Sequence, residues 1–332
     1  MSADFWLPVI FAGLMALAML IYVVLDGYDL GVGVLLNGAT DSEKDAMIAS
    51  IGPFWDANET WLVLGVGILL IAFPMAHGVI LTSLYLPVAA MLVGLILRGV
   101  AFDFRVKARE PHKPLWDRAF FAGSLLASLA QGFMLGHYIT GFAATFEADA
   151  FSMLIGISVA AGYGLLGATW LIMKSEHDLQ RKAVRWAQRA LWLTAAGIAG
   201  VSIATPLVST RIFDKWFSFP QFLLLSQIPA ISIALILTCH NRLRKLSKRI
   251  DGRQWVPFAL AVSIFVLAFA GLAYSLFPYL VIDEITIWDA ASATNSLQFV
   301  LWGVLITLPA ILGYTVFAYR VFWGKTRDLS YD

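Results

Sequence analysis

Two pairs of carboxylates interrupt the apolar sequence of this chain near its N-terminus. Asp26 and Asp29 lie three residues apart within VVLDGYDLGVGVLL, and Asp56 and Glu59 have the same spacing within GPFWDANETWLVLG. A separation of three residues places both side chains on one face of a helix. Two ionised carboxylates on one face repel each other, so such a pair readily takes up a proton. The spacing therefore favours proton transfer, and Asp103 in GVAFDFR adds a fifth acid.

Most of these acids also have a structural interpretation, which the sequence leaves open. Asp26 and Asp29 could mark the end of the first helix, where neighbouring glycines loosen the helix or allow close packing. Asp56 could cap the second helix, because Asp accepts hydrogen bonds from first-turn N–H groups. Asp103 could pair with Arg105, two residues further on.

The composition identifies a membrane protein. The chain has 332 residues, of which 60% are hydrophobic and 14% are charged, with a mean hydropathy of +0.78. Soluble domains carry about 25% charged residues, so this chain cannot cover itself with polar surface. A net charge of +1 predicts no nucleic-acid partner, and the single Cys239 excludes a disulfide framework. We therefore expect an all-α, polytopic membrane protein, because helices satisfy their own backbone hydrogen bonds in lipid.

Nine apolar runs are long enough to cross a bilayer, which takes about 20 residues. They cover residues 7–26, 55–74, 79–101, 118–140, 151–173, 186–206, 219–239, 256–280 and 298–320. The polar stretch TDSEKDAMIAS between the first two runs predicts a short helical connector. No soluble domain or long linker divides the chain, so we expect residues 1–332 to form a single integral membrane domain.

The basic residues give this nine-helix topology an orientation. With nine spans, 21 of the 23 Lys and Arg residues fall on one face, and only Arg211 and Lys215 fall on the other. Cytoplasmic loops carry the excess of Lys and Arg, which predicts an outside N-terminus and a cytoplasmic C-terminus. The five acids then lie at the cytoplasmic ends of three consecutive helices. There the cost of a charge is lower than the roughly 2.5–3.5 kcal/mol at mid-membrane.

Several sequence blocks resemble one family of respiratory enzymes. LDGYDLGVG followed by GPFWDANETWL, then VAFDFR, then SLFPYLVIDEITIWDAASATNSL occur in the order found in subunit II of cytochrome bd quinol oxidases. The compact length favours the shorter, cyanide-insensitive branch. The resemblance implies nine transmembrane helices, arranged as two four-helix bundles plus one peripheral helix. It also implies a bacterial cell inner membrane location.

The resemblance further implies a function in aerobic respiration. The complex would oxidise quinol and reduce dioxygen to water, with haems b and d and the quinol site on the partner, subunit I. This chain would bind no cofactor or metal itself and would carry no catalytic residue. It would brace subunit I, supply a cytoplasmic proton path and offer dioxygen a hydrophobic route. A small single-helix accessory subunit and membrane lipid are the other expected partners.

The matching blocks also assign roles to individual residues. Proton-pathway roles fall on the five acids, Asp56, Asp103, Asp26, Asp29 and Glu59, although Glu59 stands where some members carry an amide. The side chains expected to flank the path are Trp55, Asn58 and Trp61. On the outer side, the block DEITIWDAA predicts a contact with subunit I through Trp288 and Asp289.

Three other functions remain open at this point. A stand-alone ion-coupled transporter could use clustered intramembrane acids, although such sites usually lie near the midplane in broken helices. A haem-bearing cytochrome would need two axial ligands, and His77 and His137 both fall on the outer side. The chain could also be a purely structural oxidase subunit whose acids only hold loops.

Overall fold

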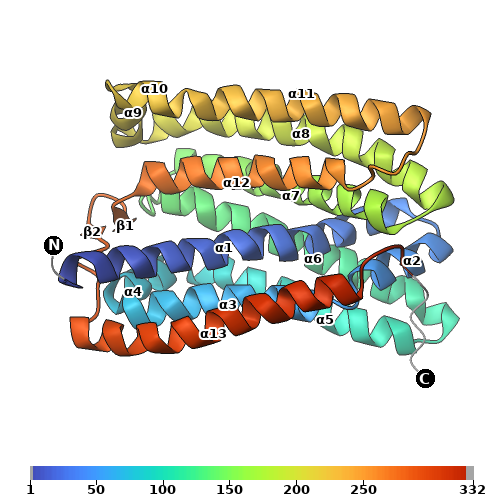
Figure 1. Ribbon diagram of the computed structural model, residues 1–332, viewed down its shortest axis with the longest axis horizontal. Coiled ribbons are helices and arrows are strands. Elements are labelled where there is room, and N and C mark those ends of the chain that lie inside the picture. The colour runs from blue at the N-terminus through green and yellow to red at the C-terminus, as the bar shows by residue number, and fades with distance from the viewer. Residues whose placement is uncertain (1–2, 327–332) are drawn as a thin grey trace.

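The computed structural model describes residues 3–326, without the side chains of Glu110 and Leu224. Helices form almost all of it (Figure 1). The helices are α1 (Ala3–Leu35), α2 (Asp41–Ile51), α3 (Trp55–Ala72), α4 (Pro74–Ser83), α5 (Tyr85–Lys107), α6 (Lys113–Ile139), α7 (Phe146–Lys174), α8 (His177–Val208), α9 (Thr210–Phe217), α10 (Gln221–Leu225), α11 (Gln227–Lys248), α12 (Val256–Leu276) and α13 (Thr294–Val321), with 3-10 turns η1 (Leu36–Gly38) and η2 (Glu110–His112). Strands β1 (Tyr279–Val281) and β2 (Ile285–Thr286) pair antiparallel before α13.

Nine segments within residues 3–326 are long and apolar enough to cross a membrane, which confirms the predicted number. The prediction was wrong about the first helix, which continues to Leu35 rather than ending near residue 26. Asp26 and Asp29 are therefore fully buried inside α1 and do not terminate it. The prediction from hydropathy ended the helix at the first acid, because a hydropathy value takes no account of a buried cation elsewhere in the chain that compensates the charge.

Helix α1 lies at the centre of the arrangement. Figure 1 shows α1 along the middle of the molecule, with α3 and α13 on one side, α7 and α12 on the other, and α8 and α11 farther out. The apolar window of α13 is 0% buried within the described chain, so this helix lies at the periphery. The central position of α1 makes its side chains the natural scaffold for a buried site.

Glycines bring α1 unusually close to α7. A Cβ atom added at Gly31 would lie 1.8 Å from the Tyr163 carbonyl oxygen, and one added at Gly167 would lie 2.4 Å from the Gly31 carbonyl carbon. No side chain fits at these distances, so both positions require glycine. Small residues allow such backbone approach between membrane helices. This packing fixes the segment of α1 that carries the two buried acids.

The predicted connector is helix α2, which is attached to the rest of the chain by ion pairs. Thr40 and Glu43 form a capping box at its N-terminus. Glu43 also accepts a hydrogen bond from Lys182 of α8, and Asp45 accepts one from Arg105 of α5 at 2.6 Å. Met47, Ile48 and Ile51 are buried in the main core. The helix therefore packs firmly at the end of the molecule where α1 finishes.

Candidate proton-transfer site within the membrane helices

The centre of the candidate site is Arg98 of α5. Its side chain is 1% exposed and contacts two carboxylates from two other helices. One Nη nitrogen donates to Asp26 Oδ1 of α1 at 2.6 Å, and the other donates to Glu59 Oε2 of α3 at 2.9 Å. The indole of Trp55 lies 5.8 Å from the guanidinium carbon. Three helices that are distant in sequence thus converge on one buried cation.

Sequence reasoning treated Arg98 as a basic residue of the following loop and missed its role. The signal was its position within the apolar run LVGLILRGVAF. An arginine inside a membrane segment is costly and almost always has a partner in the bundle interior. Two acids in α1 and two in α3 were available as partners, but the sequence did not say which would face α5.

The cluster contains more acids than cations. Asp26 and Asp29 are 0% exposed, whereas the Glu59 side chain is 31% exposed. With Arg98 as the cation facing these three carboxylates, the group becomes neutral when two of the carboxyls carry protons. Asp26 Oδ2 and Asp29 Oδ1 are buried and accept no hydrogen bond from the described residues. Such unsatisfied carboxylate oxygens are natural positions for a proton.

Asp29 is bonded to Asn58, which forms a closed ring of hydrogen bonds with Tyr28 and Tyr319. Asn58 donates to Asp29 Oδ2 and to the Tyr28 hydroxyl, both at 2.8 Å. Tyr319 of α13 donates to Asn58 Oδ1 at 3.0 Å, and the Tyr28 and Tyr319 hydroxyl oxygens are 2.6 Å apart. These distances fit one direction of donation, Asn58 to Tyr28, Tyr28 to Tyr319 and Tyr319 back to Asn58. Asn58 was predicted to flank the path, but the two tyrosines were missed.

A second polar group lies one helical turn before Asp26. Gln131 of α6 donates to the Tyr22 hydroxyl at 2.7 Å and accepts from the Tyr163 hydroxyl at 2.6 Å. Tyr22 is four residues before Asp26, so both lie on the same face of α1. Three helices are thereby joined by polar contacts within the apolar interior, directly beside the acid cluster.

Two of the five predicted acids lie outside this cluster. Asp56 in the first turn of α3 and Asp103 near the end of α5 are both exposed. The suggestion that Asp103 pairs with Arg105 is wrong, because Arg105 instead contacts Asp117 and Asp45. A charged residue on an apolar helix surface is more favourable opposite a protein partner than opposite lipid. The five acids thus form an inner group of three and two exposed members.

Comparison with known proteins identifies the family. The family profile described as cytochrome bd terminal oxidase subunit II matches residues 7–322. The chain belongs to this family. It is 29% identical to the cytochrome bd-I ubiquinol oxidase subunit 2 of Escherichia coli (strain K12), over 92% of this chain and 91% of that protein. It is 27% identical to the cytochrome bd ubiquinol oxidase subunit 2 of Bacillus subtilis (strain 168), over 91% of each.

The fold is also that of a solved oxidase. The structure of the bd oxidase from Geobacillus thermodenitrificans superposes with a TM-score of 0.78 at 17% identity, covering 95% of this chain and 98% of the other. Membership in the subunit II family implies a partner subunit I. It favours the oxidase over the transporter that the sequence alone left open.

The two residues of this subunit II chain that were predicted to contact subunit I on the outer side make contacts within the chain. The Trp288 indole donates to the Phe5 carbonyl oxygen at 3.1 Å and stacks on the Phe5 ring. Asp289 Oδ2 accepts hydrogen bonds from the backbone and hydroxyl of Thr286, which lower the pKa of this carboxyl. Both residues thus fasten the loop before α13. A contact with subunit I through them remains a prediction.

The two histidines that were predicted to lie on the outer side, His77 and His137, have separate surroundings. His137 of α6 lies 2.9 Å from Asp149 of α7 and its ring lies beside Phe133. His77 lies in α4, half-buried. Within residues 3–326, no three His, Cys, Asp or Glu side chains are grouped so as to hold a metal ion.

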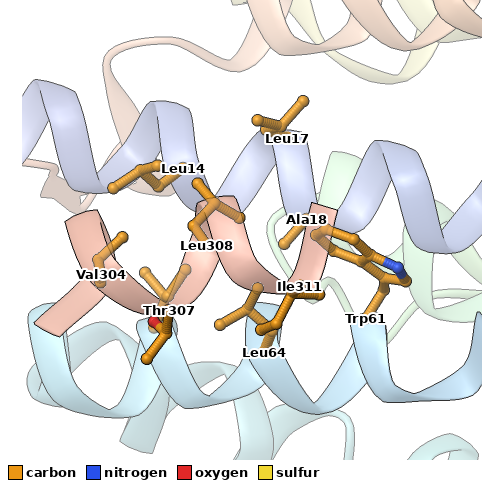
Figure 2. A pocket seen from close by; sticks show the side chains of 10 residues that line it. Leu14, Leu17, Ala18, Trp61, Leu64, Val304, Thr307, Leu308 and Ile311 are labelled. Carbon is orange, nitrogen blue, oxygen red and sulfur yellow. The ribbon is translucent and has the colours of Figure 1, made fainter. Parts of the chain in front are cut away.

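Trp61 belongs to a small apolar pocket rather than to the acid cluster. Its side chain is 2% exposed and forms one end of a pocket between α1, α3 and α13 (Figure 2). Leu14, Leu64 and Leu308 line the same space, and Thr307 is its polar member. The cavity has about 10 Å³ of free volume, roughly that of one water-sized sphere. It can hold only a very small molecule.

Proposed function

We propose that this chain is the haem-free subunit II of a cytochrome bd-type quinol oxidase, and that its buried acids deliver protons to the complex. The complex would oxidise quinol and reduce dioxygen to water on haems b and d of subunit I. That reduction consumes protons, so a membrane-embedded path to the haems is required. The observation that carries the proposal is the Asp26–Arg98–Glu59 cluster, in which a partly exposed acid and a buried acid share one buried cation.

Glu59 is the proposed point of proton uptake, because it is the partly exposed member of the inner group. Asp26 follows, since both carboxylates contact the same guanidinium, and Asp29 lies one turn further along α1. The Trp55 ring packs against the Arg98 guanidinium and so flanks this route, and Asn58 donates a hydrogen bond to Asp29. Arg98 keeps its charge at all relevant pH values, so the protons would move between the carboxylates.

Asp56 and Asp103 are proposed to act at the contact with subunit I. Both are exposed on helices whose neighbouring surface residues are apolar, including Val63 of α3 and Phe104 of α5. Subunit I would cover these carboxylates and continue the path from them. The apolar window of α13 is 0% buried within the described chain, which supports a role for this side of the molecule in bracing subunit I.

Charge and packing support a proposed orientation and subdivision of the helices. The ends of α1, α5, α7, α11 and α13 lie at one end of the molecule, opposite the start of α1 (Figure 1). The basic residues gather there in the sequence, which supports a cytoplasmic location for that end and an outside N-terminus. We assign α1, α3, α5 and α6 to one bundle, α7, α8, α11 and α12 to the other, and α13 to the periphery of a bacterial inner-membrane protein.

The pocket at Trp61 supports a second contribution. Its walls are almost entirely apolar, and its free volume suits a diatomic molecule better than a quinol. Dioxygen partitions into such surroundings, so the pocket is a proposed station on a dioxygen route. A small single-helix accessory subunit would pack elsewhere on the complex.

Affinity purification of the tagged chain from the membrane of its own cells tests this function. We expect a haem-bearing subunit I to co-purify, with quinol-dependent oxygen consumption in the purified sample. Glu59→Gln should slow that consumption while the haem absorption spectrum is unchanged. Purification without a haem-bearing partner, or haem that stays with this chain after the subunits are separated, would overturn the proposal.

A further inference from the structure

A cavity that the proton path does not use lies at the cytoplasmic ends of α7 and α13. It has a volume of about 170 Å³ and is bounded by the last turn of α7, the segment before α12 and the segment after α13. Its walls include Trp170, Trp255 and Trp323, and its charged members are Lys174 and Lys325. Among its described lining residues there is no carboxylate. The cavity therefore combines aromatic walls with two uncompensated positive charges.

Both lysines are held in place by the backbone. Lys174 is 6% exposed and donates to the Phe322 carbonyl oxygen at 2.6 Å, while its ammonium lies 5.0 Å from the Trp170 ring centroid. Lys325 donates to the Ser175 carbonyl oxygen at 2.7 Å and to the Gln254 side chain. An ammonium has three donors, so each lysine keeps at least one for another partner. These fixed positions make the pair a preorganised site.

Among the described residues that line the cavity, no carboxylate neutralises the charge of the two lysines. Burial lowers the pKa of the Lys325 ammonium, and Glu176 opposes that change. Asp251, which follows α11, is occupied by a hydrogen-bonded pair with Arg242. The described surroundings thus leave one buried ammonium group, on Lys174, and one half-buried ammonium group, on Lys325, in need of an anion.

We propose that this cavity binds a phosphate group, that of an anionic phospholipid in the cytoplasmic leaflet. Basic pockets between membrane helices on this side bind such head groups. The exposed indoles of Trp255 and Trp323 lie at helix ends, where tryptophan prefers the interface between lipid and water. The aromatic walls would contact the glycerol region while the lysines contact the phosphate.

The cavity is adjacent to the acid site. Tyr319 lines it and also donates to Asn58 Oδ1, and Trp170 lines it and stacks on Tyr28 at 4.2 Å. A bound head group would therefore contact Tyr319, a member of the hydrogen-bonded ring that holds Asp29, and Trp170, which packs on Tyr28 of the same ring. This placement gives the lipid a role in ordering α13 against the rest of the chain.

Lipid binding to the purified, delipidated oxidase complex tests the proposal, with native mass spectrometry as the readout. The probes are phosphatidylglycerol, phosphatidylcholine of the same chain length, and inorganic phosphate, whose binding is followed by equilibrium dialysis. Each Lys→Gln change at 174 or 325 should weaken phosphatidylglycerol binding about fivefold, since one surface lysine contributes about 1 kcal/mol toward an anionic lipid. Lys325→Arg should retain binding, and Lys248→Gln is the matched control on the same face.

The outcomes separate the sources of the phosphate. Lysine-dependent binding of phosphatidylglycerol, with phosphatidylcholine unaffected, supports a lipid head group, and equal lysine-dependent binding of inorganic phosphate supports a free anion at the same site. Identical binding by wild type and Lys174→Gln/Lys325→Gln, in variants with unchanged haem spectra, would overturn the proposal.

Discussion

Replacing Arg98 with glutamine should separate the structural role of the acid cluster from its proposed proton-transfer role. The change leaves Asp26, which is 0% exposed, without the cation that contacts it at 2.6 Å. Removing one partner of a buried ion pair costs about 3–5 kcal/mol, a large part of the roughly 5–15 kcal/mol that stabilises a typical folded domain. We therefore expect Arg98→Gln to lower the amount of the proposed oxidase complex that assembles, and to lower its melting temperature sharply.

A double substitution tests whether the uncompensated charge of Asp26 causes this loss of assembly. Asp26→Asn/Arg98→Gln removes both charges and leaves Glu59, whose side chain reaches water. Assembly should largely recover, whereas quinol-dependent oxygen consumption should stay low because the proposed buried proton carrier, Asp26, is gone. Arg181→Gln is the matched control, since its pair with Asp178 is exposed and should contribute less than about 1 kcal/mol. The reasoning fails if Arg98→Gln assembles and turns over normally, or if the double variant regains full turnover.

The other expectations concern the uptake acid, the tyrosine ring and the helix packing. Glu59→Gln should slow oxygen consumption without loss of assembly, measured by turnover across pH at constant haem content, and unchanged turnover at every pH would remove Glu59 from the path. Tyr319→Phe leaves the buried carbonyl of Asn58 without its donor, which should cost about 1–3 kcal/mol and lower the melting temperature of the complex; an unaltered melting curve would contradict the ring. Gly31→Ala should abolish assembly, because its Cβ would meet an α7 carbonyl oxygen at 1.8 Å. Gly13→Ala is the control, with nothing within 4 Å of its Cβ, and equal yields of the two variants would refute the packing argument.

The sequence predicts the number of membrane spans because length and hydropathy are local properties. Nine runs of apolar residues suffice to find the nine candidate spans of the described chain. The ends of the helices are harder to predict from the sequence, as α1 shows. Its helix continues through Asp26 and Asp29 because Arg98, 72 residues away from Asp26, supplies a compensating charge. No window along the sequence contains that pair.

The candidate site was predicted in part, for a comparable reason. Spacing correctly placed acids on α1 and α3, but it did not decide which face of each helix would be buried. Residues three apart on a helix are displaced by about 60° around its axis, given about 3.6 residues per turn. That displacement is enough for Asp56 to be exposed while Glu59 is half-buried at the edge of the interface with α5. The partners of these acids are set by helix packing, which single-sequence reasoning does not provide.

The choice of arginine at position 98 fits the proposed path better than lysine would. A guanidinium presents separate nitrogens in a fixed plane, and here each contacts a different carboxylate, Asp26 on the buried side and Glu59 on the side that reaches water. If a proton passes from Glu59 to Asp26 along the proposed path, the cation neutralises the newly ionised Glu59 without moving. A lysine would have to swing its single nitrogen between the two acids. The fixed cation thus keeps the energies of the two protonation states close, because one negative charge always remains in contact with it.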